Sequence, residues 1–281
     1  MKPANLRTLG PREAQLVLTL SEQGRETVTT AEAVALLGSM GSARNVIQGL
    51  VQKGWLTRLV GGRYLFLPPE RGPENLGENN ALALASAVVE PSYVGWWAAA
   101  AFHGLTTQKP STIAVAVLQQ RPAREIEGTT IRFVKVAPRK FYGFEEFDVF
   151  GRSVRLSTAA KTIVDCLDRP DLCGGSSELA RIVFGGISLV EPAVLVEEAL
   201  RMQSAALLQR LGFLADLVHW KLDAELRARL RDAIPASART RFGRVDRREG
   251  DIGYVHDWGI FVHASRRDLL ADVPHVSSAA A

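Results

Sequence analysis

The sequence has very few cysteines. Only Cys166 and Cys173 occur among its 281 residues, and they do not form a C-x-x-C pair. Two cysteines are too few for the disulfide framework that stabilises small secreted domains. We therefore expect two ordinary reduced thiols.

Long apolar runs are also missing. The most apolar long stretch, residues 81–102, is interrupted by Glu90, Pro91 and Ser92, and the first 15 residues hold no apolar segment of a signal peptide. These features predict a cytoplasmic protein with no membrane partner. A composition of 47% hydrophobic and 23% charged residues excludes disorder and collagen-like structure, and the length predicts one or two globular domains.

Acidic residues are absent from one segment, residues 42–69. This segment carries four basic side chains: Arg44, Lys53, Arg58 and Arg63. The net charge of the chain is +4, and the whole excess lies in residues 1–69, since the remaining basic and acidic side chains balance. A local positive field of this kind attracts polyanions.

The same part of the chain has the pattern of two short helices. Gly10 and Pro11 predict the start of the first helix, because proline is favoured in the first helical turn. Thr29 and Glu32 have the spacing of a capping box, in which each side chain accepts a backbone N–H of the other residue. A second helix is predicted to follow over residues 30–37.

A third helix and a hairpin complete the pattern. Ser42 is in position to cap the third helix, and its apolar side chains recur at helical spacing until Lys53. Residues 55–60 and 63–67 read as two strands joined by Gly61-Gly62, which permits the positive φ angles of a tight turn. Three helices followed by such a hairpin predict a winged helix-turn-helix that binds double-stranded DNA.

The polar face of the third helix holds side-chain types that read bases. Arginine bonds guanine, and asparagine and glutamine bond adenine, when a helix lies in the major groove. The predicted base-reading residues are Arg44, Asn45, Gln48 and Gln52. We add Lys53, and we expect Arg58 and Arg63 of the hairpin to be free to contact phosphates, which position the protein without specifying sequence. The alternative is that this is only the solvated face of an amphipathic helix.

A proline- and glycine-rich stretch separates this domain from the rest of the chain. The predicted organisation is a DNA-binding domain over 1–69, a linker over 70–80 and a larger domain over 81–281. The larger domain starts with an alanine-rich helix. Its other predicted elements are strands near 111–118 and 129–136, helices near 158–167, 176–184 and 191–231, and a hairpin of 253–255 and 258–263 that closes the sheet. Because helices and strands do not alternate strictly, the fold class is α+β.

Several stretches of the larger domain resemble one known family. In order, they are "YVGWWAAAAFHGLTTQKP", "IRFVKV", "KFYGFEEFDVFGRSVRLSTAAKTIVDCLDRPDLCGG" and "QRLGFLADLV". This series resembles the C-terminal domain of AbiEi-type antitoxins over about residues 93–218. Two positions depart from the family pattern: Gly95 stands where serine is usual, and Ala160 where an acidic residue often precedes the lysine.

The resemblance implies a toxin-antitoxin system used in abortive defence against phage. Such an antitoxin represses its own operon by binding inverted repeats near the promoter. Its C-terminal domain neutralises a nucleotidyltransferase toxin, in several members without a stable complex. An N-terminal winged helix is part of the family plan, in agreement with the pattern of residues 1–69.

No catalytic, cofactor or metal site is predicted. "AAKTIVD" lacks the glycines of a P-loop, so Lys161 and Asp165 are interpreted as an i, i+4 pair on a helix. "RPDLCGG" lacks the Glu-x-Lys pair of a nuclease, and His103 is interpreted as a helix cap beside Gly104. Two alternatives stay open: a nucleic-acid-processing enzyme targeted by the winged helix, and a transcriptional regulator that responds to a small effector.

Two further basic runs lie in the larger domain. Residues 121–140 hold six basic and two acidic side chains, and residues 227–248 are rich in arginine with only Asp232 and Asp246 against it. A solvated surface is the ordinary interpretation of such runs. The alternative is a second surface for nucleic acid.

Overall fold

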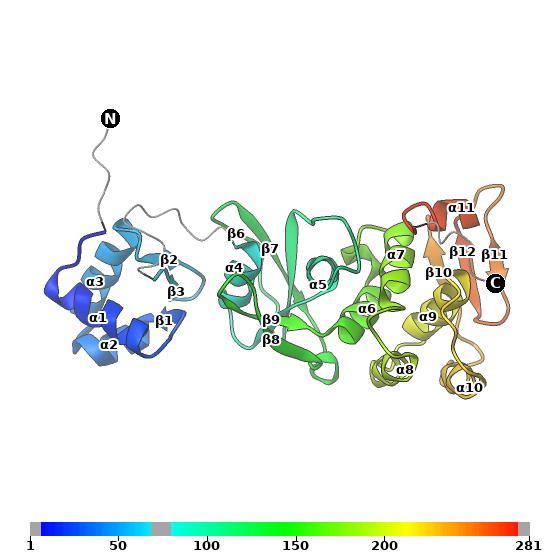
Figure 1. The fold of residues 1–281 in the computed structure, drawn as a ribbon, viewed down its shortest axis with the longest axis horizontal. Helices are drawn as coiled ribbons and strands as arrows, with labels where there is room; N and C mark the ends of the chain where they lie inside the picture. Colours follow the sequence, from blue (N-terminus) through cyan, green and yellow to red (C-terminus); the bar gives the residue numbers. More distant parts are fainter. Residues whose placement is uncertain (1–6, 69–79, 275–281) are drawn as a thin grey trace.

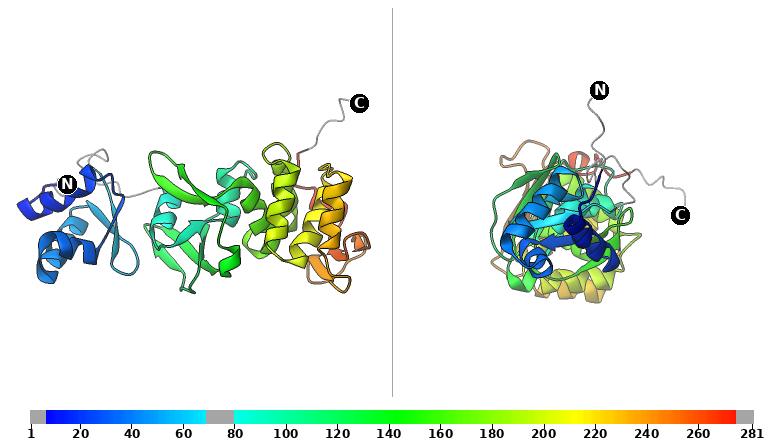
Figure 2. Two further views of the ribbon diagram at one scale, coloured as in Figure 1. Left: turned by 90° about the horizontal axis from the view of Figure 1, so that it is seen from below. Right: turned by 90° about the vertical axis from the view of Figure 1, so that its left-hand side faces the viewer.

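The structure is a computed structural model that describes residues 7–68 and 80–274. The molecule is elongated, with an N-terminal unit, a central sheet with its helices, and a helical C-terminal part arranged in a row (Figure 1). The same order along the long axis is seen from below (Figure 2). The predicted α+β class is confirmed. The predicted linker lies outside the described residues, except for Asn80.

The N-terminal unit has three helices and a three-stranded antiparallel sheet. Its elements are α1 (Pro11–Glu22), β1 (Thr27–Thr29), α2 (Thr30–Leu37), α3 (Met40–Gln52), β2 (Leu56–Arg58) and β3 (Arg63–Phe66). The strand order is β1-β3-β2. The helices and the hairpin occur in the predicted order, whereas β1 was not predicted. The sheet lies on the side of the unit that faces the central part (Figure 1).

Local signals fix the ends of these elements. Thr29 and Glu32 form the predicted capping box, and Gly61 and Gly62 have φ angles of 67° and 74° in the hairpin turn. The predicted cap of α3 was wrong. Ser39, not Ser42, is the N-cap, and its hydroxyl accepts the N–H of Ser42 at 3.2 Å. Because the left-handed C-cap Gly38 ends α2 directly before it, α3 begins earlier than the sequence indicated.

The central part contains a six-stranded mixed sheet in the order β6-β7-β5-β4-β9-β8. The strands are β4 (Ser92–Val94), β5 (Thr112–Val117), β6 (Arg124–Ile126), β7 (Thr129–Lys135), β8 (Phe144–Asp148) and β9 (Ser153–Ser157). The associated helices are α4 (Ala81–Ala87), α5 (Trp96–Phe102), η2 (Pro138–Lys140) and α6 (Ala159–Asp168). The single alanine-rich helix predicted here was wrong, since α4 and α5 are separate helices with β4 between them.

Alternate residues of β5 face two different cores. Val115 belongs to the cluster that includes Leu84 of α4, and Ala114 and Ala116 belong to the cluster that includes Ile163 of α6. The sheet is therefore covered on both faces. This explains why its inner strands read as nearly continuous apolar runs in the sequence.

The C-terminal part is mostly helical and carries a small sheet. Its elements are η3 (Pro170–Leu172), α7 (Ser176–Gly186), α8 (Pro192–Arg201), α9 (Ala205–Leu217), α10 (Ala224–Asp232), β10 (Thr240–Gly243), β11 (Gly253–Val255), β12 (Ile260–His263) and α11 (Arg266–Leu269). The predicted final hairpin is present as β11 and β12, but it does not close the central sheet. It forms a separate sheet with the order β10-β12-β11, because helices including α6, α7 and α9 lie between the two sheets (Figure 1).

The small sheet packs on α9. Trp258, just before β12, is 1% exposed, and a Cβ atom at Gly212 of α9 would lie 2.2 Å from its ring. The indole therefore occupies the space that a side chain at Gly212 would need. Its Nε1–H donates to Asp216 of α9 at 2.7 Å.

The N-terminal unit is packed onto the central part. Leu59, Leu65 and Leu67 of the hairpin region belong to the same buried cluster as Leu84 of α4. The Arg152 guanidinium donates to the Phe66 carbonyl oxygen at 3.0 Å across this boundary. The hairpin is thus part of an interface between the two units. Among the described residues, no helix is both long and apolar enough to span a membrane.

Candidate functional site

The outer face of α3 carries the four predicted base-reading side chains. Arg44, Asn45, Gln48 and Gln52 are all exposed. The opposite face packs on the other helices through the buried Val46 and related apolar side chains. Within the described residues, no hydrogen bond or ion pair occupies any of the four polar side chains. They form one continuous polar surface, which we call the α3 face.

Helix α3 belongs to the N-terminal unit, which forms one end of the molecule (Figure 1). The helices of the N-terminal unit lie away from the central part, and the sheet lies between them and α4 (Figures 1 and 2). The face also lacks acidic side chains of its own helix, since residues 40–52 contain none.

The other three predicted DNA-binding residues, Lys53, Arg58 and Arg63, have different environments. Arg58 is exposed, lies 5.7 Å above the Tyr64 ring and makes no ion pair with any described residue. Lys53 is paired with Glu13 at 2.6 Å. Burial acts to raise the pKa of Glu13, but the Gly10 N–H and Lys53 outweigh it and hold the pKa below its ordinary value. Glu13 is therefore ionised at neutral pH and offsets the charge of Lys53.

The prediction that Arg63 is free to contact phosphates was wrong. Its guanidinium lies 2.8 Å from Glu90 of the central part and donates to the Thr27 hydroxyl at 3.0 Å. Glu90 also pairs with Arg155 at 2.5 Å. Residues 42–69 contain no acidic residue, but Glu13 and Glu90 from other segments neutralise part of their positive charge in the folded protein.

The second cluster of polar residues is buried in α6. Lys161 is 0% exposed and its ammonium group contacts the Asp165 carboxylate, which confirms the predicted i, i+4 pair. The Tyr93 hydroxyl donates to Asp165 at 3.1 Å and accepts from Lys161 at 3.2 Å. Burial raises the pKa of Tyr93 well above its usual value, so the phenol stays protonated. We call these three residues the buried triad.

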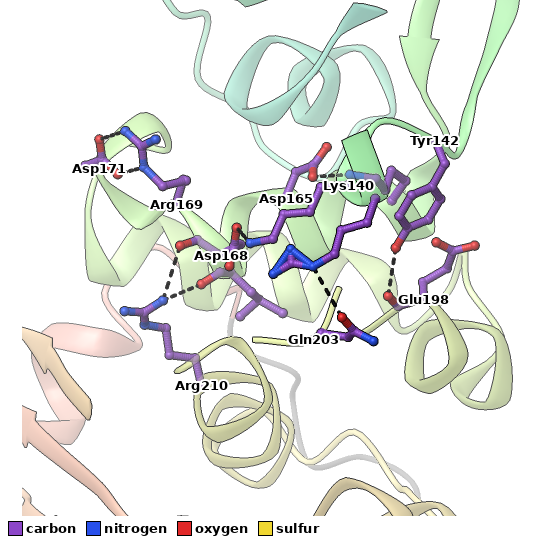
Figure 3. Close-up of polar contacts among 12 residues, drawn as sticks. Lys140, Tyr142, Asp165, Asp168, Arg169, Asp171, Glu198, Gln203 and Arg210 are labelled. Atoms are coloured by element: carbon purple, nitrogen blue, oxygen red, sulfur yellow. Dashed lines mark hydrogen bonds and ion pairs between the residues drawn. The ribbon is translucent and has the colours of Figure 1, made fainter. Parts of the chain in front are cut away.

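Other polar side chains surround the C-terminal end of α6 (Figure 3). Lys140 pairs with Asp168 at 2.5 Å, and Arg210 of α9 donates to the Leu167 carbonyl oxygen at 2.7 Å. The Tyr142 hydroxyl donates to the Glu198 carbonyl oxygen of α8 at 3.1 Å. These bonds join three helices and the loop after β7. Cationic groups at a helix C-terminus also satisfy its free carbonyl groups.

The buried triad cannot be a reactive site in this conformation. Its ammonium and carboxylate groups are enclosed, so no substrate reaches them. A buried charge pair costs desolvation free energy and persists where hydrogen bonds satisfy both groups, as here. The polar residues around α6 thus hold it against β4 and the loop after β7.

The structure also shows the environments of His103 and of the two cysteines. His103 is the C-cap of α5, followed by Gly104 at φ 70°, and its Nε2 lies 2.7 Å from the Ser157 carbonyl oxygen. Both cysteines are free and buried. Among the described residues, no group of three or more His, Cys, Asp or Glu side chains could hold a metal ion.

Four of the eight arginines in the run 227–248 pair with acidic residues elsewhere in the fold. Arg227 pairs with Asp216, Arg229 with Glu197 at 2.5 Å, Arg231 with Asp257 at 2.9 Å, and Arg244 with Asp251 and Asp268. These ion pairs were not predictable because all five acidic partners lie outside the run. The run is therefore not a uniform positive surface.

The fold and these sites define an α+β protein with an exposed polar helix at one end and a buried charged network at its centre. No model of a known protein family matches the chain, and no curated protein matches it. A solved structure does match: the RV2827C protein from Mycobacterium tuberculosis, with 17% sequence identity and a TM-score of 0.62. The match covers 96% of this chain and 97% of that one, so the two share a fold over nearly their whole length.

Proposed function

We propose that this protein is a DNA-binding transcriptional autorepressor and an antitoxin of the AbiEi type, which counteracts a nucleotidyltransferase toxin. The observation that carries the proposal is the α3 face. It combines unpaired Arg, Asn and Gln side chains on a helix at one end of the molecule.

The geometry of α3 suits a recognition helix. It has 13 residues, so it is about 20 Å long, and an α-helix of this kind fits the major groove of B-DNA. Arg44 and Gln48 are four residues apart and lie on one stripe, with Asn45 and Gln52 beside it. The preceding α2 ends only two residues before α3, as in a helix-turn-helix.

The docked hairpin restricts how a DNA duplex would be held. Because Arg63 is paired with Glu90, the hairpin supplies one free cation, Arg58, among its described arginines. Base contacts from α3 would then contribute most of the sequence preference, and Arg58 would contact the backbone. Operator inverted repeats would require two copies of the chain, one on each half-site.

Binding to the promoter of its own operon tests the DNA-binding proposal. We expect Arg44→Ala or Gln48→Ala to weaken binding to this promoter by about 1–3 kcal/mol each, because each variant loses a base contact. Affinity for unrelated duplex DNA should change little. Lys109→Ala, at an exposed lysine in the loop before β5, is the control for charge. An equal loss on all sequences would show that α3 does not read bases.

The antitoxin role is supported by the motifs of residues 93–218, whose side chains build the buried triad and its surroundings. It is tested by a growth-rescue assay with the neighbouring nucleotidyltransferase gene. We expect cells that produce the toxin to recover growth when this protein is co-expressed. If the operon encodes no nucleotidyltransferase, the antitoxin proposal fails.

A pocket beside α7 favours a second candidate function, a transcriptional regulator that responds to a small effector. It has a volume of about 710 Å³ and is lined by His103, Arg181, Phe184, Leu189 and other residues of α7 and its surroundings. Apolar walls with a few polar groups are typical of small-molecule sites of this size. A ligand that raises the melting temperature of the protein but not of a Phe184→Ala variant would support this candidate.

A further inference from the structure

The outer face of the C-terminal sheet presents one residue from each strand in a straight row. Arg241 of β10 lies opposite Phe261 of β12, and Phe261 lies opposite Tyr254 of β11. We call these three residues the basic–aromatic row. Their neighbours Phe242 and Ile260 point the other way and are buried against the helices. Alternation along the strands therefore places the row on the side away from α9.

Phe261 is unusually exposed for a phenylalanine in the middle strand of a sheet. Its side chain is 40% exposed, whereas Ile260 and Val262 beside it are fully buried. The ring centroids of Tyr254 and Phe261 are 4.6 Å apart, and the Tyr254 and His256 centroids are also 4.6 Å apart. The result is a continuous aromatic surface made of these three rings.

Positive charge beside these rings is not neutralised. No ion pair among the described residues involves Arg239 or Arg241, in contrast to Arg231 in the same run. Arg239 is held in place by donating to the Ala236 and Ala238 carbonyl oxygens at 2.8 and 2.7 Å. Its guanidinium lies 5.7 Å from the Tyr254 ring centroid. The fold thus fixes a cation next to the aromatic surface.

A pocket lies next to the aromatic surface, at the end of the sheet. It has a volume of about 240 Å³, and Arg239, Tyr254 and His256 contribute to its walls. The acidic residue at its edge, Asp257, is paired with Arg231. A planar ring could therefore enter next to Tyr254 without facing an unpaired carboxylate from these residues.

We propose that this face binds a single-stranded polynucleotide. Unpaired bases stack on Phe261 and Tyr254, and Arg239 and Arg241 contact the phosphates. Exposed aromatic side chains on a sheet, with arginines beside them, are the features by which proteins bind single strands. A duplex does not fit this arrangement, because its bases are stacked on one another and cannot reach the rings. The site is at the opposite end of the molecule from α3, so it does not depend on the proposed function (Figure 1).

The test is fluorescence anisotropy with the full chain and labelled, unstructured strands of about 12 nucleotides, within the range that single-strand sites occupy. One strand is oligouridylate and the other oligothymidylate. We expect Phe261→Ala to weaken binding about tenfold or more, because base–aromatic stacking is lost. Arg241→Ala should weaken binding and flatten its salt dependence. Phe261→Trp should bind at least as well as the unchanged protein, and Phe261→Leu should bind as weakly as Phe261→Ala.

Matched controls separate this site from general surface effects. Phe150 is 93% exposed on the turn between β8 and β9, so Phe150→Ala removes an exposed ring elsewhere. Lys109→Ala removes an exposed charge from the loop before β5, outside both basic runs. Both controls should bind single strands normally. Tighter binding of oligouridylate than of oligothymidylate would identify RNA as the ligand, and equal binding would identify single strands in general.

Three results would overturn the proposal. The first is no binding of either strand by the unchanged protein, and the second is normal binding by both Phe261→Ala and Arg241→Ala. The third is normal binding by Phe261→Leu, which would exclude stacking. Binding of duplex promoter DNA in the same preparations is a separate readout. It should be unchanged in Phe261→Ala and lowered in Arg44→Ala, so failure of one proposal is distinguishable from failure of the other.

Discussion

Lys161 shows how a single residue depends on its surroundings. The side chain is fully buried, contacts Asp165 and Tyr93, and lies 4.9 Å below the Tyr142 ring. Gly143, at φ 68°, leaves room for it, since a Cβ atom there would lie 3.0 Å from the Lys161 side chain. Its ammonium group therefore has three specific neighbours and is shielded from solvent.

We predict that Lys161→Met lowers the free energy of unfolding by about 3–5 kcal/mol, because it leaves the Asp165 carboxylate buried and unpaired. Adding Asp165→Leu and Tyr93→Phe removes the remaining polar groups and should recover most of the loss. Urea unfolding monitored by circular dichroism measures both changes. If the triple variant were as unstable as the single variant, burial of an unpaired charge would not be the cause.

Contacts between residues close together in the sequence were predictable, and contacts between distant residues were not. The Thr29–Glu32 capping box, the Gly61-Gly62 turn and the Lys161–Asp165 pair were predictable, because each depends on residues at most four positions apart. The Lys53–Glu13 and Arg63–Glu90 ion pairs were not, because the partners are 40 and 27 positions apart and no local pattern links them. The predicted free charge of Arg63 failed for this reason.

At the scale of elements, the hairpin of β2 and β3 has two roles. One side of it covers the core of the N-terminal unit through Tyr64 and Phe66, and Leu65 reaches the core of the central part. Three-residue strands such as β1 and β4 were missed because so short a segment shows no clear alternation. Their pairing with strands distant in the sequence decides that they form.

The two arginines of the hairpin should respond differently to mutation. We predict that Arg58→Ala weakens binding to every DNA duplex and flattens the salt dependence, because a phosphate contact and its counterion release are lost. Arg63→Ala should leave the salt dependence unchanged and lower thermal stability instead, because it leaves Glu90 with one partner fewer. Binding titrations at several salt concentrations, beside melting curves, check both. Similar salt slopes for the two variants would contradict this assignment.

The contact between α9 and the small sheet should be sensitive to acid. Burial acts to raise the pKa of Asp216, but hydrogen bonds from Arg227 and Trp258 outweigh it, so the pKa lies below its usual value. Such a carboxylate stabilises the folded state at pH values above its ordinary pKa. This stabilisation is lost as the pH falls below about 4. Asp216→Asn should therefore destabilise the protein at pH 7 and have a smaller effect at pH 3, measured by urea unfolding with tryptophan fluorescence.

At the scale of the whole molecule, the proposed activities lie on different parts of one continuous structure. Removing residues 1–69 would expose the apolar surface of α4 that Leu59, Leu65 and Leu67 cover. A full-length variant is therefore a cleaner test than a fragment of residues 81–281. The linker composition indicated two separable domains, but the packing between them could not be predicted, since it is formed by side chains far apart in the sequence.

We predict that the double variant Arg44→Ala, Gln48→Ala fails to repress the promoter yet still protects cells from the toxin. The substituted residues are exposed on α3 and touch neither the interface nor the buried triad. A promoter-reporter assay beside a growth-rescue assay measures the two activities. Loss of rescue by a variant that is folded would show that neutralisation requires DNA binding.

The shared cluster at the hairpin also has a consequence for the order in which the protein is made. Residues 59–67 leave the ribosome before α4, so Leu65 and Leu67 stay without their partner Leu84 until the chain has grown past residue 84. A prematurely terminated chain that ends in the linker would hold the N-terminal unit with Leu59, Leu65 and Leu67 uncovered. Incomplete translation products would thus be substrates for proteases rather than weak repressors that compete for the operator.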